Sequence, residues 1–207
     1  MAGFEILLKG FAEFRRENYG GSDALMPRLT QDGQNPDYFI ISCIDSRSHP
    51  GTIFRAQPGT FFGHKAMGAI VRPWQRGTAL SAALQFSIKY NKVEKIIILG
   101  HTGCGAIKAL VENLDDEEIS SFIAVAQTGL EKAKSCCGNP HPGPELLRRT
   151  EEQIVLQSTE NLKTYPIVRK ALEEGRIEIA SWIFNMEEGA IYSFNAEKGI
   201  FMPLQLP

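Results

Sequence analysis

The segment KIIILGHTGCG, residues 95–105, is the most informative stretch of the chain. Its continuous apolar run is typical of a strand buried on both faces of a parallel sheet. The three glycines that follow favour a tight turn that opens a helix. His101 and Cys104 lie in that turn, just past the carboxyl end of the predicted strand, where α/β proteins place their functional sites.

The segments on either side extend the same pattern. Residues 37–42 are aromatic and β-branched and predict a second buried strand, with Cys43 at its carboxyl end. Further strands are predicted over residues 59–63, 176–184 and 190–194, the last two as a closing pair. Helical spacing of apolar residues predicts helices over residues 77–89, 116–134, 145–163 and 166–174. Alternating strands and helices predict an α/β fold with a central, mostly parallel β-sheet flanked by helices.

The N-terminal residues 1–21 predict a helical arm on a single domain that spans residues 1–207. An apolar stripe runs along the helix expected over residues 3–17, and Gly20-Gly21 ends it. The stripe consists of Phe4, Leu7, Leu8, Phe11 and Phe14. It can cover either the core of its own chain or a partner subunit.

Composition excludes several classes of protein. The net charge of −2 gives no reason to expect a nucleic-acid partner. The longest plainly apolar run, residues 96–99, is too short to cross a membrane. We see no secretory signal at the N-terminus and therefore expect a cytoplasmic protein. The four cysteines are then expected to be reduced, and available for catalysis or for a metal.

Cys43, His101 and Cys104 have the chemistry of a zinc site. If the strands over residues 37–42 and 95–99 are neighbours in the sheet, all three side chains meet at one edge. Two thiolates and an imidazole suit zinc and leave a fourth tetrahedral position for water, substrate or a carboxylate. Each motif alone is weak, because a cysteine after a strand is usually just a small apolar residue. The combination of both motifs at strand ends is much stronger.

Asp45 and Arg47 follow Cys43 at intervals of two residues. In an extended segment, positions two apart face the same way, so all three side chains are expected to line one wall. An arginine can hold a carboxylate with two hydrogen bonds and keep it ionised. The interval between Cys43 and Arg47 is too short for the phosphate-binding loop of a cysteine phosphatase.

Together these motifs resemble those of the β-class carbonic anhydrases. The likeness rests on Cys-Ile-Asp-Ser-Arg at residues 43–47 and Gly-His-Thr-Gly-Cys-Gly at residues 100–105. It extends to Gly-Gln-Asn-Pro at 33–36, Pro-Gly-Thr-Phe-Phe at 58–62, and a closing region with Asn161-Leu162, Tyr165-Pro166, Gly175 and Trp182. The resemblance implies reversible hydration of CO2 to bicarbonate and a proton, by attack of a zinc-bound hydroxide.

The resemblance also implies roles for individual residues. Cys43, His101 and Cys104 would bind one Zn²⁺ per chain, and Asp45 and Arg47 would form a catalytic dyad beside it. Substrate-binding positions would be Gln34, acting across a dimer interface, Phe62 and Phe86, lining a small CO2 pocket, and Gly103. The family implies a homo-oligomer with a dimer as its basic unit, which often assembles further, for example into a homotetramer.

One segment departs from the family. Where the family usually reads Arg-Asn-x-x-Asn, this chain has Lys65-Ala-Met-Gly-Ala69. Ile40 and Lys65 occupy the positions that build an inhibitory bicarbonate site in some members, so we expect no such site here. We also expect an open form, in which water is the fourth zinc ligand; Asp45 would bind the metal only in a closed form.

Two alternative functions stay open. The same fold and ligands can hydrolyse CS2 or COS, which are linear molecules close to CO2 in shape. A catalytically silent subunit that binds zinc and bicarbonate is the other alternative, supported only by the altered residues 65–69. His49, His64 and His141 are candidate proton shuttles, but each is expected to be a surface histidine. Cys136 and Cys137 are expected to be ordinary thiols.

Overall fold

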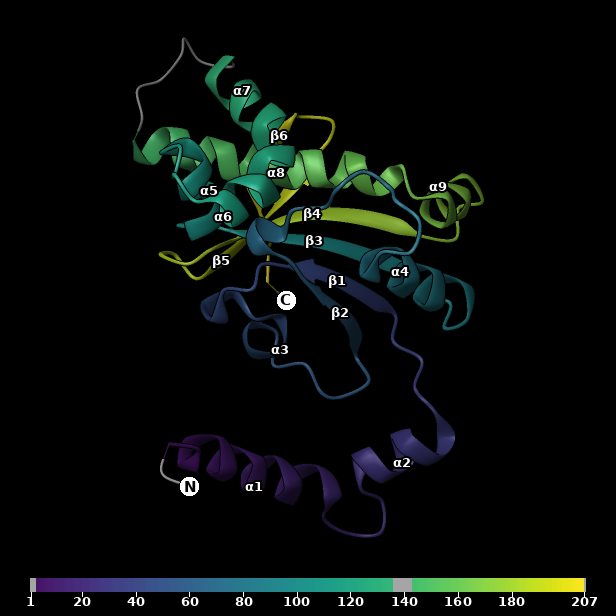
Figure 1. The fold of residues 1–207 in the computed structure, drawn as a ribbon. Coiled ribbons are helices and arrows are strands. Elements are labelled where there is room, and N and C mark those ends of the chain that lie inside the picture. The colour runs from purple at the N-terminus through teal and green to yellow at the C-terminus, as the bar shows by residue number, and fades with distance from the viewer. Residues whose placement is uncertain (1–2, 136–142, 207) are drawn as a thin grey trace.

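The computed structural model describes residues 3–135 and 143–206 and centres on one six-stranded sheet (Figure 1). The strand order is β2-β1-β3-β4-β5-β6. The strands are β1 (Tyr38–Ser42), β2 (Phe61–Lys65), β3 (Lys95–His101), β4 (Glu178–Asn185), β5 (Ala190–Asn195) and β6 (Ile200–Pro203). The strands β2, β1, β3 and β4 pair in parallel, while β5 and β6 are added antiparallel. The predicted α/β fold with a mostly parallel sheet is confirmed.

Helices cover both faces of this sheet. The helices of the described residues are α1 (Glu5–Tyr19), α2 (Leu25–Asp32), α3 (Pro50–Ile53), α4 (Ala79–Lys89), α5 (Gly105–Val111), α6 (Glu117–Ile123), α7 (Gln127–Ser135), α8 (Pro144–Lys163) and α9 (Pro166–Glu173), of which α1 and α2 lie away from the sheet. Figure 1 shows α8 along one face and α3 on the opposite side. Among the described residues, no helix combines the length and the apolar character needed to cross a bilayer.

The strand β3 explains why the apolar run is continuous. Ile96 and Ile98 pack into the core beneath α4, α8 and α9. Ile97 and Leu99 belong to a separate cluster on the other face. Because both faces of the strand are covered, alternation of apolar and polar residues is absent, as expected for a central parallel strand.

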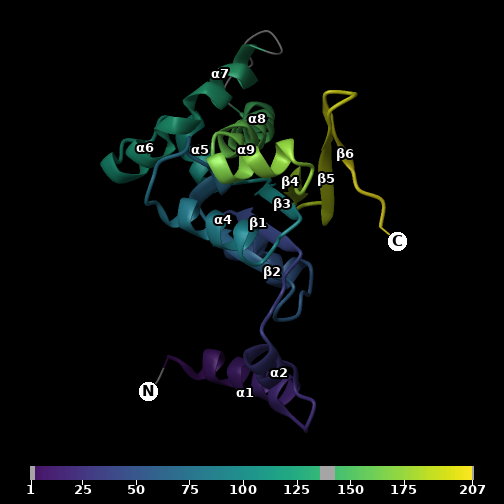
Figure 2. The same cartoon turned by 90° about the vertical axis from the view of Figure 1, so that its right-hand side faces the viewer.

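The N-terminal arm stands apart from the rest of the chain (Figures 1 and 2). Neither α1 nor α2 contains a buried residue. Phe4, Leu7 and Phe11 are 63%, 68% and 57% exposed, so the apolar stripe does not cover the core of its own chain. The predicted helical arm is confirmed, and its apolar face is left for another surface.

Several elements differ from the prediction. The helix expected over residues 116–134 is broken into α6 and α7 by a 3₁₀ turn at Ala124–Ala126, because apolar spacing continues through the tighter turn and hides the break. The helix α2 was not predicted; it is only eight residues long and contains no buried residue. The edge strand β6 was also missed; it is four residues long and ends in a proline, both weak features of a strand.

Gly100 allows α8 to lie directly on the sheet. A methyl group at this position in β3 would overlap Val155 Cγ2 of α8. Val155 is fully buried in the main core. The close approach of α8 to β3 therefore requires a residue without a side chain at position 100.

We predict that Gly100→Ala lowers the free energy of unfolding by about 1–3 kcal/mol, because the added methyl group overpacks the core between β3 and α8. Gly63→Ala is the matched control, since a methyl group there would meet Phe61 at an ordinary 3.5 Å. Urea denaturation of both variants measures the difference. Equal stability of the two variants would contradict the proposed close packing.

Candidate metal centre

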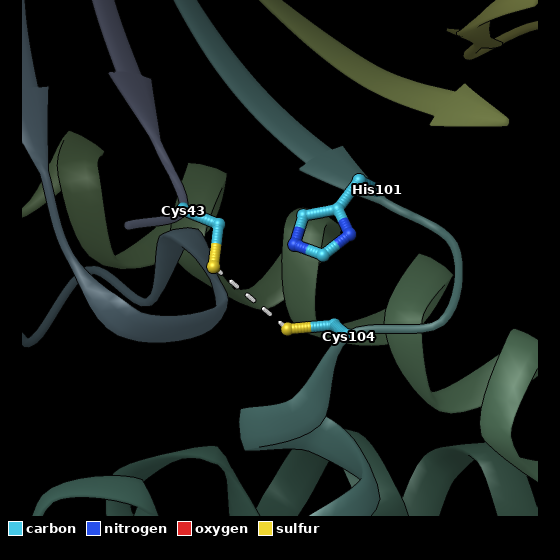
Figure 3. A group of neighbouring side chains, drawn as sticks. All are labelled: Cys43, His101 and Cys104. Atoms are coloured by element: carbon cyan, nitrogen blue, oxygen red, sulfur yellow. Dashed lines mark hydrogen bonds between the residues drawn. The ribbon is translucent and has the colours of Figure 1, made fainter. Parts of the chain in front are cut away.

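Three side chains meet where two neighbouring parallel strands end (Figure 3). Cys43 directly follows β1, His101 is the last residue of β3, and Cys104 precedes α5. The register pairs Ser42 with Leu99, which places the carboxyl ends of the two strands together. The ligand atoms of the three buried residues all lie within 4.8 Å of one another.

The turn between His101 and Cys104 depends on its glycine. Gly103 has a φ of 65°, in the left-handed region that glycine adopts without strain. This conformation lets the chain reverse within three residues, so that an imidazole and a thiol from one turn point to the same place. The predicted glycine turn that opens a helix is present.

The three side chains fit a tetrahedral cation such as zinc. The two sulfur atoms lie 3.9 Å apart. With Zn–S bonds of about 2.3 Å, tetrahedral geometry separates two sulfurs by about 3.8 Å. Nδ1 of His101 lies 3.0 Å from the carbonyl oxygen of Thr102, while its buried Nε2 has no hydrogen-bond partner among the described residues. An Nδ1–H donated to that carbonyl leaves Nε2 with a lone pair for a metal.

The electrostatics of the thiols point the same way. A hydrogen bond from Cys104 lowers the pKa of the Cys43 thiol to about 4, against the opposing effect of burial. The Gly68 N–H donates to the same sulfur at 3.3 Å. The bond to Cys43, together with burial, raises the pKa of Cys104 above its usual range. The pair thus holds one negative charge readily, and a second thiolate requires a cation beside it.

Asp45 and Arg47 form a two-pronged ion pair next to this group. Arg47 Nε–H donates to Oδ1 of Asp45 at 3.1 Å, and Nη2 donates to Oδ2 at 2.8 Å. The Arg47 side chain thereby holds the pKa of Asp45 well below its usual range. Oδ2 of Asp45 lies 4.0 Å from Nε2 of His101.

The predicted reason for this pairing was wrong. The segment is not extended: Asp45 caps a 3₁₀ turn over Ser46–Ser48 and accepts a hydrogen bond from the Arg47 N–H at 2.9 Å. The turn, rather than strand alternation, brings the guanidinium back onto the carboxylate. Both oxygens of Asp45 are consequently engaged by Arg47.

A hollow of about 550 Å³ opens beside the ion pair. Cys43, Asp45 and Arg47 form its polar side. The remaining wall is largely apolar and includes Ile44, Met67, Ala106, Ala109, Leu114 and Ile119. A small apolar molecule in this hollow would share its wall with Cys43 and Asp45.

The other predicted substrate-binding residues do not line this hollow in the single chain. Gln34 is exposed in the link between α2 and β1. Phe62 and Phe86 contact each other edge to face, with ring centroids 6.1 Å apart, and Phe86 is 53% exposed. Their roles in binding substrate stay predictions.

The remaining singled-out residues fall in different places. His49 is exposed as expected, whereas His64 is half-buried and lines a separate hollow of about 180 Å³ with Tyr165. Lys65 is the exposed last residue of β2. Cys136, Cys137 and His141 lie outside the described residues.

Sequence reasoning missed Glu151. This residue of α8 is 2% exposed, and its Oε1 accepts a hydrogen bond from the Cys104 N–H at 2.8 Å. Its position was visible in the sequence, because it is a charged residue three and four positions before the buried Ile154 and Val155. A carboxylate on an apolar helical face indicates a specific partner in the interior.

Comparisons with known proteins agree with this geometry. A sequence model of the carbonic anhydrase family matches residues 38–191. Carbonic anhydrase 1 of Escherichia coli O157:H7 is 30% identical over 204 residues, which cover 96% of this chain and 91% of that protein. The chain belongs to the β-class carbonic anhydrase family. It is therefore an enzyme of the carbonate dehydratase class.

Other carbonic anhydrases show the same relationship. The chloroplastic beta carbonic anhydrase 5 of Arabidopsis thaliana is 29% identical over 187 residues, or 88% of this chain. The match spans 62% of the plant protein, which is less than two thirds of its length. Two tetrameric β-carbonic anhydrases of Sordaria macrospora are known from crystal structures, and a chain from these structures superposes on the present one with a TM-score of 0.84. The two chains are 23% identical, and the match covers 95% of this chain and 98% of the other. At this identity the likeness bears on the fold.

We predict that Cys43→Ser, His101→Ala and Cys104→Ser each lose most of the bound zinc, because each removes one of the three side chains that can bind the metal. His64→Ala is the control and keeps its zinc, since His64 lies outside the metal group. Metal analysis after dialysis against a weak chelator measures zinc per chain. Full zinc content in a ligand variant would contradict the assignment.

We also predict a pH effect on stability from His64. Burial lowers the pKa of His64, so the unfolded chain binds its proton at a higher pH than the folded chain does. The stabilising contribution is complete above the unfolded value of about 6.5 and is lost as the pH falls through the folded value.

Urea denaturation at pH 7.5 and 5.5 tests this expectation. The wild type should lose more stability between the two values than His64→Gln does. His49→Gln removes an exposed histidine instead and should behave like the wild type. An identical loss in the wild type and His64→Gln would exclude the effect.

Proposed function

We propose that this carbonic anhydrase hydrates CO2 reversibly with one zinc ion held by Cys43, His101 and Cys104. The observation that carries the proposal is the buried group of two thiols and an imidazole, whose ligand atoms lie within 4.8 Å. Bound zinc would lower the pKa of a water molecule and so supply hydroxide near neutral pH. The sulfur spacing of 3.9 Å and the unpartnered Nε2 of His101 support zinc as the ion.

Asp45 is proposed to orient the attacking oxygen. Its carboxylate is ionised and fixed by two hydrogen bonds from Arg47, and it lies 4.0 Å from His101 Nε2. From that position it can accept a hydrogen bond from the nucleophile and aim the attacking lone pair at the substrate carbon. Arg47 positions Asp45 and keeps it charged.

The same ion pair supports the open form of the site. A carboxylate whose two oxygens accept hydrogen bonds from Arg47 has less capacity to bind a metal as well. Breaking this pair would cost a bidentate, charge-assisted interaction. Water or substrate, rather than Asp45, is therefore proposed as the fourth zinc ligand.

The hollow beside Asp45 is proposed to hold CO2. Its wall includes Ile44, Met67 and Leu114, and an apolar surface suits a molecule without a net charge or dipole. Bicarbonate is charged and gains little from such a wall, which favours its release. The backbone of Gly103 is proposed to contact substrate from the turn beside Cys104.

A second copy of the chain is proposed to complete the site. The exposed stripe on α1, with Phe11 57% exposed, supports a homodimer in which residues 1–21 pack on the partner. Gln34, Phe62 and Phe86 are proposed to bind substrate in that dimer. The Sordaria enzymes are described as tetrameric, and further assembly into a tetramer is proposed here.

A cytoplasmic location is proposed on chemical grounds. Cys43 and Cys104 are free thiols in the described part of the chain. Metal-binding thiols persist in a reducing compartment, where oxidation does not compete for them.

Stopped-flow CO2 hydration on protein of known zinc content tests the proposal. Two thiolates neutralise the charge of zinc, so water should be activated less than in a site with three histidines, where its pKa is about 7. We predict activity that is proportional to zinc and higher at pH 8.5 than at pH 7. Asp45→Ala should keep its zinc and lose at least about 100-fold in rate.

Asp32→Ala changes an exposed carboxylate at the end of α2 and serves as the control. Full activity in Asp45→Ala would remove Asp45 from the mechanism. A zinc-loaded wild type without CO2 hydration would overturn the proposed function. The same samples can then be assayed with COS and CS2, and inactivity toward them as well would favour a silent subunit.

A further inference from the structure

Glu151 contacts the backbone of Cys104 and is not among the residues that line the hollow proposed to take substrate. It is a residue of α8 and is 2% exposed. Its Oε1 accepts a hydrogen bond from the backbone N–H of Cys104 at 2.8 Å. The contact joins residues 47 positions apart in the sequence and ties α8 to the turn that carries two of the three proposed zinc ligands.

Burial of a carboxyl group at this position costs free energy. Ile154 and Val155, one turn further along α8, are fully buried and apolar. Glu151 is almost as buried as these neighbours, and removal of a carboxylate from water disfavours its charged form. An apolar residue would pack here without that cost, so the oxygen atom is retained for a specific contact.

Thr102 anchors the start of this turn, because its N–H donates to the Phe184 carbonyl and its Oγ1 accepts from the Met186 N–H, both at 3.0 Å. Cys104 lies at the other end of the turn. Gly103 and Gly105 flank Cys104 and contribute no side chains. Cys104 has no side-chain cap of its own at the start of α5. At this end of the turn, the Glu151 oxygen therefore holds backbone that the two neighbouring glycines leave without side-chain support.

The helix α8 is a rigid support for this contact. It is 20 residues long and packs on β3, where Gly100 admits Val155. Packing on the sheet thus fixes the position of α8, and α8 fixes the position of the Glu151 carboxyl. The hydrogen bond from Cys104 to that carboxyl then fixes the Cys104 backbone. Hydrogen bonds behind the ligands of a metal fix their orientation in the same way.

We propose that Glu151 is a positioning residue, whose side-chain oxygen holds the Cys104 backbone so that its thiolate meets zinc together with Cys43 and His101. The proposal rests on the zinc site of the proposed function. The contact requires an acceptor oxygen at the distance from α8 that a glutamate side chain spans. It does not require the negative charge.

Two substitutions separate reach from charge. Glu151→Gln keeps an oxygen at the same distance from the backbone and removes the charge. Glu151→Asp keeps the charge and withdraws the oxygen by about 1.5 Å, the length of one C–C bond. The matched controls are Glu152→Gln and Glu152→Asp, because Glu152 is the next residue of α8 and its Oε1 faces Arg148 Nε at 3.7 Å.

Zinc affinity is measured by competition with a chromogenic chelator, and the Co²⁺-substituted proteins are compared by visible absorption. Glu151→Gln should keep the wild-type affinity and spectrum. Glu151→Asp should bind zinc about 10–100-fold more weakly, as expected for loss of a contact behind a ligand. Its thiolate-to-Co²⁺ bands should shift, whereas a merely structural glutamate would change only the melting temperature.

Each outcome decides between the possibilities. Equal affinities for Glu151→Asp and the wild type would overturn the positioning role while leaving the proposed zinc site intact. A loss in Glu151→Gln as large as in Glu151→Asp would also overturn it, because charge would then be the requirement. If Glu151→Asp does not fold, a loss of zinc affinity in Glu151→Gln would still overturn the proposal. A wild type that binds no zinc would overturn both this proposal and the proposed function.

Discussion

Two thiols and an imidazole share one buried place in this molecule, and both thiols can be ionised together only if a cation balances their charge. Much of the surrounding architecture serves this one requirement. The parallel pairing of β1 with β3 brings Cys43 to the turn at the end of β3. Gly103 gives that turn its shape, and α8 supports it from behind through Glu151.

The site contains a buried group of metal-binding side chains and a partly exposed ion pair, which have different electrostatic roles. The metal group is buried and depends on contacts within the fold, whereas the Arg47 side chain is 64% exposed and Asp45 18% exposed. Asp45 therefore keeps a fixed charge at the border between the protein interior and the open hollow. A reaction that converts an uncharged gas into a charged product needs such a border, with an apolar wall for the substrate and a route to water for the product.

Local patterns predicted much of this, and distant contacts account for the rest. The apolar run of β3 and the cysteine after β1 predicted the metal group, because ends of parallel strands meet at one edge of a sheet. The Asp45–Arg47 pair was predicted for a wrong reason, since strand alternation cannot describe a 3₁₀ turn. The contact of Glu151 was not predicted, because its partner is 47 residues away and the helical period gives no information about that distance. The edge strand β6 is similarly set by its pairing with β5.

The parallel register between β1 and β3 also governs the order in which the chain can mature. Cys43 and Cys104 are 61 residues apart, and a parallel pair requires the whole crossover to be in place before they meet. In classical zinc fingers the ligands are close in sequence, and the metal itself nucleates the fold. Here a nascent chain offers only one imidazole and one thiol from the turn, which is half of a tetrahedral shell. The complete set of three side chains therefore forms only after β1 and β3 have paired, and a chain that has not folded this far would offer an ion only part of the site.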